Sequence, residues 1–127
     1  MQYIQTTQKS VQETVSAIEK IAPNYKFGVL NIRNMKETLV SKGFELKEEC
    51  YIIDICNPSI AFTFLSEDML LSSVLPCKIS VYSQEGETTI VMNSLTQMVD
   101  DINPDCIEVA QEAQAALQTI IDEASTK

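Results

Sequence analysis

The sequence predicts an α+β fold, in which a single antiparallel sheet is covered by helices on one face. Strand-like and helix-like patterns alternate along the chain, and the predicted helices carry apolar stripes that a sheet can bury. The last two strands are joined by a hairpin turn at residues 84–87, which argues against a doubly wound parallel sheet. A chain of 127 residues can bury its own core, so we expect one domain over residues 1–127.

The first half of the chain contains the signals for three strands and two helices. Alternation of apolar and polar residues predicts strands at residues 1–6, 25–32 and 46–56. Ser10 and Glu13 form a capping box that begins the first helix, and Pro23 ends it after Ala22. The second helix is short, and Gly43 supplies its left-handed cap.

The second half contains the signals for two more strands and two more helices. Asn57 is a natural N-cap and Pro58 a natural first helical residue, whereas residues 66–73 give no clear pattern. Strands are expected at residues 77–82 and 88–93. Asp105 is expected to cap a long final helix. The stripe that this helix buries consists of Cys106, Val109, Ala110, Ala113, Leu117, Ile120, Ile121 and Ala124.

The charge of the chain argues against nucleic acid as a partner. The net charge is −9, and residues 48–127 hold two lysines against fourteen acidic residues. Residues 1–47 hold seven basic residues against four acidic ones. An acidic field repels phosphate backbones. The asymmetry fits a solvated acidic surface that aids solubility, or an attraction between the two halves within the fold or across a dimer interface.

The sequence also gives no sign of export or of insertion into a membrane. Its first residues lack the basic and apolar regions of a secretory signal. No window approaches the run of about 20 apolar residues that a membrane-spanning helix needs. We therefore expect a cytoplasmic protein without a membrane partner, in which the four cysteines are reduced.

The residue types present exclude several kinds of chemistry. The chain has no histidine, which removes the usual hydrolase triad, and its three glycines form no phosphate-binding loop. The cysteines form no close pairs of the kind that structural zinc sites use; they are Cys50, Cys56, Cys77 and Cys106. We therefore expect neither a metal nor a cofactor.

Cys56 and Cys77 define the candidate site, because one ends a strand and the other begins one. In an antiparallel sheet both can lie at the same end, and Cys56 also precedes a helix N-terminus, which favours the thiolate. The functional interpretation is a redox or sulfur-handling pair, or part of a soft-metal site. Asp54 on the same strand opposes thiolate formation, but in an apolar strand it is also the best candidate for a general acid or base. Packing as small apolar side chains is the more common role of free cysteines.

Two further residues complete the candidate site. Asn57 is explained by its role in starting a helix, and no ligand is needed to account for it. Gly28 interrupts a strand, which indicates a bulge, a closely packed helix or a backbone that a ligand approaches.

The order of several short motifs resembles the family called domain of unknown function 302. The motifs are Phe27-Gly28-Val29-Leu30, Lys36-Glu37-Thr38-Leu39, Lys42-Gly43-Phe44, Cys56-Asn57-Pro58 and Leu75-Pro76-Cys77. The resemblance implies a fold like that of the TATA-binding protein, with a curved antiparallel sheet and helices on one side. It also implies a bacterial or archaeal protein that forms a homodimer. No activity is assigned to the family as a whole.

The chain departs from the family pattern at one place. Many members carry a His-Asp pair just after the Phe-Gly strand, where this chain has Asn31-Ile32-Arg33-Asn34. If that pair serves as a ligand or base in relatives, this protein lacks it.

Three functional hypotheses follow from the sequence. The first is a homodimeric, non-enzymatic protein that has an accessory role or binds a small molecule. Its pocket would lie between the sheet and the helices, or at the dimer interface. The alternative is a thiol-based redox or sulfur-transfer protein that uses Cys56 and Cys77. The third is a purely structural interaction module.

Overall fold

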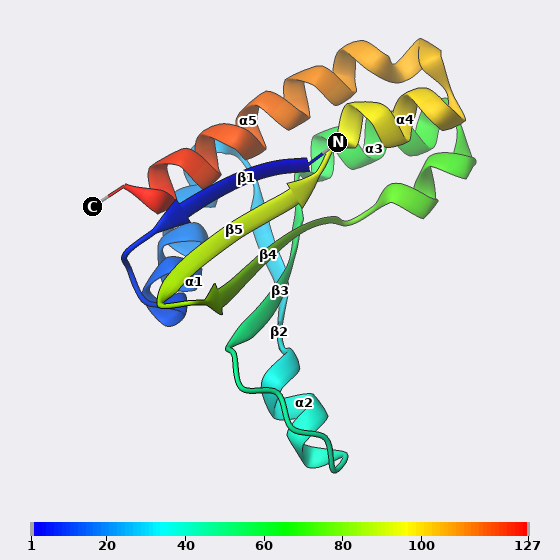
Figure 1. Ribbon diagram of the computed structural model, residues 1–127. Helices are drawn as coiled ribbons and strands as arrows, with labels where there is room; N and C mark the ends of the chain where they lie inside the picture. Colours follow the sequence, from blue (N-terminus) through cyan, green and yellow to red (C-terminus); the bar gives the residue numbers. More distant parts are fainter. Residues whose placement is uncertain (1, 127) are drawn as a thin grey trace.

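The protein is built on one five-stranded antiparallel sheet, seen in a computed structural model that describes residues 2–126 (Figure 1). The strands are β1 (Gln2–Thr7), β2 (Gly28–Asn34), β3 (Cys50–Cys56), β4 (Cys77–Gln84) and β5 (Glu87–Asn93). Their order across the sheet is β1-β5-β4-β3-β2, and every neighbouring pair is antiparallel. The α+β class expected from the sequence is confirmed.

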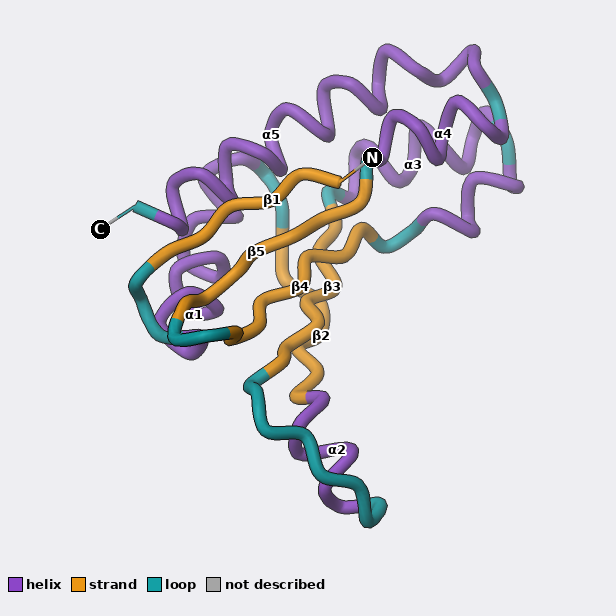
Figure 2. The backbone as a smooth tube through the Cα atoms, in the orientation of Figure 1, coloured by secondary structure: helices purple, strands orange, loops and turns teal. Residues whose placement is uncertain are grey.

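Five α-helices and three short 3-10 turns connect and cover the strands (Figure 2). The helices are α1 (Val11–Ile21), α2 (Met35–Ser41), α3 (Pro58–Glu67), α4 (Leu95–Ile102) and α5 (Ile107–Ser125). The 3-10 turns are η1 (Ala22–Tyr25), η2 (Met69–Val74) and η3 (Pro104–Cys106). The long helix α5 contacts α1, α4 and the edge strand β1, so it ties the helical layer together.

Local sequence signals fix the ends of these elements. The Ser10 hydroxyl accepts a hydrogen bond from the Glu13 amide at 3.1 Å, and the Ser10 amide donates to the Glu13 carboxylate at 2.9 Å. This is the expected capping box, which satisfies two amides at the start of α1. Glu85 and Gly86 connect β4 to β5 with φ angles of 52° and 82°, the left-handed conformations that a two-residue hairpin turn requires.

The core lies between one face of the sheet and the helices. Side chains alternate along each strand, and the inner face carries fully buried residues from β3, β4 and β5. These are Ile53, Ile55, Ile79, Val81 and Ile90. The helices contribute their own buried stripes, chiefly Val11, Val15 and Ile18 of α1, and Ala110, Ala113, Leu117, Ile120 and Ile121 of α5. The stripes expected for α1 and α5 therefore face the sheet.

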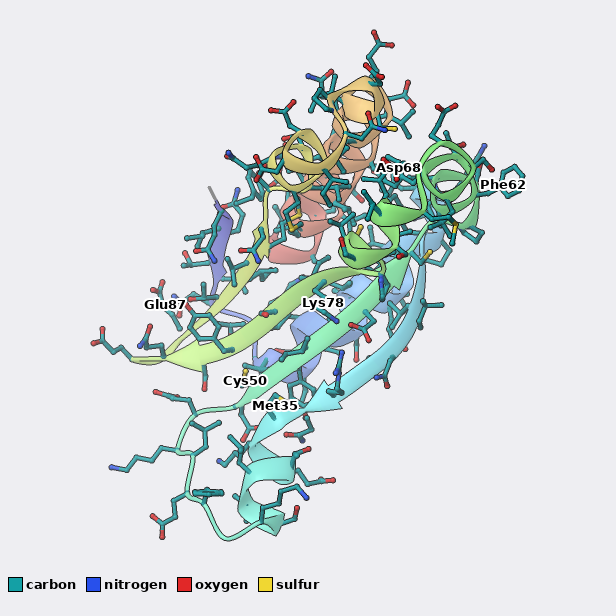
Figure 3. All side chains as sticks on the ribbon, turned by 90° about the vertical axis from the view of Figure 1, so that its right-hand side faces the viewer. Met35, Cys50, Phe62, Asp68, Lys78 and Glu87 are labelled. Carbon is teal, nitrogen blue, oxygen red and sulfur yellow. The ribbon has the colours of Figure 1, made fainter. Side chains whose placement is uncertain are left out.

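The opposite face of the sheet, which we call the open face, has no helix packed on it (Figure 3, where α1 lies behind the strands). Ile4, Val91, Ser80 and Ile52 lie side by side in one row across four strands. Ile4 keeps 54% of its surface exposed, and its three neighbours are only partly buried. Three of these four side chains are apolar, which is unusual on an uncovered sheet face, because such a surface is normally polar.

Two predicted strands begin later than the sequence indicates. The strand expected at residues 25–32 begins at Gly28, because Tyr25 closes a 3-10 turn and Lys26 takes a left-handed conformation with a φ of 66°. The strand expected at 46–56 begins at Cys50. The residues before Cys50 are not part of the strand, although the Glu49 carbonyl accepts a hydrogen bond from the Ser83 amide of β4 at 3.0 Å.

Two further boundaries differ from the sequence-based prediction. The last helix begins at Ile107 and not after an Asp105 cap, because Asn103 caps the intervening turn η3 by accepting from the Asp105 amide at 3.0 Å. The uncertain residues 66–73 form the end of α3 and most of η2. Met1, which was included in the first predicted strand, lies outside the described residues.

Residues 35–49, which contain α2 and the chain that returns from it, project from the sheet as an arm (Figures 1 and 2). None of the seven residues of α2 is buried, and Phe44 on the returning chain is 64% exposed. Lys36 braces the arm by donating to the Lys47 carbonyl at 3.1 Å and to the Glu49 carboxylate at 3.2 Å. The arm is thus held in shape by polar contacts, while its apolar side chains Val40 and Phe44 face solvent.

Candidate functional site

The five residues predicted as a site lie together at one end of strands β2, β3 and β4. Gly28 of β2 pairs with Cys56 of β3, and Cys77 of β4 pairs with Ile55. Asp54 directly precedes Ile55 on β3, and Asn57 directly follows the last residue of that strand. The expectation that Cys56 and Cys77 sit at the same end of the sheet agrees with this register.

The two cysteines nevertheless belong to opposite faces of the sheet. Cys77 pairs with the fully buried Ile55, so its side chain belongs to the inner face. Cys56 follows Ile55 on the same strand, and alternation places it on the open face with Asp54. The two thiols therefore lie at the same end of the sheet but do not face one another as a pair.

Asn57 has a clear structural role at this end of the sheet, whereas Gly28 has none that requires a glycine. The Asn57 side chain accepts from the Ser59 amide at 3.0 Å and from the Ile60 amide at 3.3 Å, which is the helix-start role expected of it. A Cβ atom placed on Gly28 would meet no heavy atom within 4 Å, so no close contact requires a glycine there. The register shift expected of a bulge occurs just beyond it, between Val29 and Asn31.

Asp54 is the centre of a charged cluster on the open face. Its carboxylate accepts from the Lys78 amine at 2.7 Å and from one Arg33 nitrogen at 3.0 and 2.9 Å. Asp54 is buried, while both cations remain about half exposed (Lys78 is labelled in Figure 3). These three are the only charged residues of β2, β3 and β4, and together they carry one net positive charge. We call them the Arg33–Asp54–Lys78 cluster.

This cluster changes the role expected of Asp54. The hydrogen bond from Lys78, helped by the charges of Lys78 and Arg33, lowers the pKa of the Asp54 carboxyl although burial opposes this. The sequence-based hypothesis of a raised pKa, suited to acid–base chemistry, is therefore not supported by the surroundings of Asp54. Its partners escaped sequence reasoning because they come from the two neighbouring strands.

Burial makes both candidate thiols weak acids. It raises the pKa of Cys77 to about 11, with a smaller contribution from the neighbouring Cys56. Burial also raises the pKa of Cys56, despite its place before a helix. A thiol with a raised pKa stays protonated at neutral pH, and the protonated form is a poor nucleophile. These surroundings resemble those of packed cysteines more than those of reactive ones.

A cavity of about 260 Å³ opens beside Cys77, on the inner face of the sheet at the end where β4 begins. It lies between η2, the start of β4, the end of β5, and helices α4 and α5. Its walls are mainly apolar, and they include Leu75, Cys77, Met92, Leu95, Met98 and Leu117. Three of these side chains carry sulfur, so we call this space the sulfur-lined cavity. Sequence reasoning found only the cysteine, because the two methionines come from β5 and α4.

A second depression is larger but has a different character. It measures about 500 Å³, is more open to solvent, and runs between β1, α4 and α5. Its walls include five glutamines: Gln2, Gln97, Gln111, Gln114 and Gln118. Gln114 already accepts a hydrogen bond from the Thr96 amide at 3.0 Å, as part of the start of α4. None of the predicted site residues lies here, so the sulfur-lined cavity is the better candidate.

Residues 2–126 show neither a cluster of the usual metal ligands nor a membrane-spanning helix. No three His, Cys, Asp or Glu side chains gather in a way that could hold a metal ion. None of the helices in that range is both long and apolar enough to cross a membrane.

The fold and the position of the site define the class of protein to which this chain belongs, an α+β protein with one antiparallel sheet and helices on a single face. A family comparison matches residues 3–124 to "Domain of unknown function DUF302". The chain belongs to that family, as the motifs of the sequence indicated.

A solved structure supports the same assignment. The crystal structure of an uncharacterized conserved protein DUF302 from Bacillus stearothermophilus is 31% identical to this chain. The match covers 97% of each chain with a TM-score of 0.93. A comparison with curated proteins finds no significant match.

Proposed function

We propose that this protein is a homodimeric, non-enzymatic binding protein that holds a small ligand in the sulfur-lined cavity. The observation that carries the proposal is the cavity itself, an apolar space of about 260 Å³ at the end of the sheet where the predicted site residues meet. Its size is just below the usual range of ligand pockets, roughly 300–1,000 Å³, so a small ligand fits it best.

The walls of the cavity favour binding over catalysis. Leu75, Leu95 and Leu117 supply apolar surface, and the single charged residue of the wall is Lys78. The Lys78 amine is engaged by Asp54 at 2.7 Å on the open face. No histidine exists in the chain to transfer protons, and burial raises the pKa of the Cys77 thiol. These features support a site that holds a small ligand without reacting with it.

Filling the cavity should abolish binding of a small apolar probe. We expect fluorobenzene, followed by ¹⁹F NMR, to bind saturably, as benzene does to an engineered apolar cavity of about 150 Å³. Met98→Trp should block the probe, because the larger ring occupies the cavity that Met98 lines. Gln97→Trp is the control, because Gln97 is the exposed neighbour of Met98 on α4 and does not line this cavity. Equal binding by both variants would contradict the proposal.

The homodimer has support from the arm and the open face. Phe44 and Val40 of the arm are 64% and 53% exposed, and Ile4 on the open face is similarly exposed. A two-turn helix without buried residues gains little stability by itself. A symmetric pair of chains can cover both surfaces at once, because each chain presents one arm and one open face.

Charge also favours a second copy of the chain at this surface. The arm holds three lysines and four glutamates, a net charge of −1, and the Arg33–Asp54–Lys78 cluster holds a net charge of +1. The two therefore balance, while the whole chain carries −9. Two strongly acidic chains meet with the least repulsion where their surfaces are neutral.

Replacing Phe44 should therefore weaken the dimer. We expect Phe44→Ser to raise the dissociation constant by roughly 30-fold, corresponding to about 2 kcal/mol for an aromatic anchor. Analytical ultracentrifugation over a concentration series measures this constant. Phe62→Ser is the matched control, because Phe62 is even more exposed, at 74%, but lies on α3 at the rim of the molecule (Figure 3). A wild-type protein that is monomeric at tens of micromolar would sink the dimer proposal.

The alternative of a thiol-based redox or sulfur-transfer protein has less support. It needs Cys56 and Cys77 to face one another, and it needs at least one of them to be a reactive thiolate. Alternation along β3 puts them on opposite faces of the sheet, and burial raises the pKa of each. No observation on these two residues favours this role over packing.

A further inference from the structure

We propose that the sulfur-lined cavity binds the soft monovalent cation Cu(I), through the sulfur atoms of Cys77, Met92 and Met98. This inference rests on the proposed function, since it names the chemical class of ligand that the cavity takes. It starts from three sulfur-bearing side chains that line one space of about 260 Å³.

The topology brings these three side chains together from separate parts of the chain. Cys77 precedes Ile79 on the inner face of β4, and Met92 follows Ile90 on the inner face of the adjacent strand β5. The β4–β5 ladder ends at the pair Ser80 and Val91, and beyond this pair Cys77 and Met92 both line the cavity. Met98 reaches the same cavity from α4, which begins two residues after β5 ends.

Packing accounts for part of each methionine, because Met92 belongs to the buried core and Met98 packs against it. Methionine often fills irregular gaps in a core because its chain is flexible and its sulfur polarizable. Here Met92 is buried and Met98 half-buried, and both also line the sulfur-lined cavity. Their side chains are therefore placed to meet something that enters the cavity.

The donor set selects a soft cation. Thiolate and thioether sulfurs are ligands of Cu(I), whereas carboxylate and carbonyl oxygens suit Mg²⁺, Ca²⁺ and Mn²⁺. None of the residues that line the cavity is Asp, Glu or His. The expectation of no metal, drawn from the sequence, concerned zinc and considered only thiols and imidazoles, so it left thioethers out.

The charge balance suits an apolar wall. On binding, the Cys77 thiol gives its proton to solvent, and its sulfur bonds to Cu(I) without any change of oxidation state. One thiolate, two neutral thioethers and one monovalent cation then form a site of zero net charge. A neutral complex avoids the large cost of burying an uncompensated ion among leucines. A divalent cation with the same ligands would leave one positive charge buried.

A competition titration tests the proposal. Reduced protein is titrated with Cu(I) held by bicinchoninate under anaerobic conditions, and the fall in the absorbance of the chelate complex gives stoichiometry and affinity. We expect one Cu(I) per chain. Met92→Leu and Met98→Leu preserve volume and should each weaken binding by about tenfold or more, the loss seen even for outer-shell changes at metal sites. Cys77→Ser should abolish binding.

Matched controls separate this site from other sulfur atoms. Met35→Leu on α2 and Cys50→Ser on the open face do not touch the cavity and should bind Cu(I) as the wild type does. Unchanged affinity in both cavity methionine variants would overturn the proposal. So would loss of binding in Cys56→Ser with full binding in Cys77→Ser, because the ion would then sit on the open face.

The fluorobenzene measurement distinguishes the two levels of inference. A wild-type protein that binds fluorobenzene but no Cu(I) keeps the binding function and overturns the metal site. A protein that binds neither overturns both. Ag(I), which does not change oxidation state, should raise the midpoint of thermal unfolding of the wild type by mass action, and this rise should be smaller in Met98→Leu. A rise of equal size in that variant would count against thioether ligation.

Discussion

Phe64→Ala is expected to destabilise the protein by about 3–5 kcal/mol, the usual cost of truncating a fully buried phenylalanine. Phe64 is the largest of the fully buried side chains, and it is the one residue of α3 that is buried completely. Its loss removes apolar contacts and leaves a cavity that neighbouring elements fill only in part. Urea denaturation followed by circular dichroism measures the change in the free energy of unfolding, since the chain has no tryptophan for fluorescence.

The same helix supplies the control for this prediction. Phe62 lies two residues away on α3, points into solvent, and is 74% exposed (Figure 3). Phe62→Ala should change the free energy of unfolding by no more than about 0.5 kcal/mol, as surface substitutions usually do. If the two variants lost equal stability, α3 would not be oriented as the structure has it.

Removing the Asp54 carboxylate is expected to cost about 1–3 kcal/mol, because it leaves charged groups without their partner. In Asp54→Ala, Arg33 and Lys78 become neighbouring like charges on the open face. Both cations are about half exposed, and water screens their repulsion, which keeps the expected cost at the lower end of that range. Asp100→Ala on the exposed side of α4 is the control and should be nearly neutral.

The pH dependence of stability tests the cause of the Asp54 effect. The folded-state pKa of Asp54 is lowered, chiefly by the hydrogen bond from Lys78, so its contribution to stability is present at neutral pH. It should fade as the pH drops from the unfolded value, about 3.9, down through the lower folded value. The stability difference between the wild type and Asp54→Ala should therefore shrink in acid. A difference that grew in acid would point to a steric cause.

Much of the fold could be read from the sequence because its signals are local. The Ser10–Glu13 capping box and the Asn57 cap each depend on residues at most three positions apart, and both form as expected. The arm could not be foreseen in this way. Residues 46–49 alternate like a strand, but their possible pairing partners on β2 are replaced by α2, and only Glu49 bonds to β4, through Ser83.

The candidate site was predictable in position but not in chemistry. Sequence order correctly indicated that Cys56 ends one strand and Cys77 begins another, at the same end of the sheet. Which face each occupies depends on the strand register, which the sequence left open. The partners of Asp54 and the methionines near Cys77 come from other elements, and no spacing along the chain relates them.

The two edges of the sheet are poor templates for adding strands from other molecules. Along β2 the shift between Val29 and Asn31 breaks the regular ladder of hydrogen bonds, which discourages edge-to-edge pairing. Along β1, Gln5 donates to Asp122 of α5 at 2.9 Å, and the Tyr3 hydroxyl donates to the same carboxylate. These contacts anchor β1 beneath α5. Chains that associate should therefore form closed assemblies through the open face, and open-ended fibres should not grow from the native state.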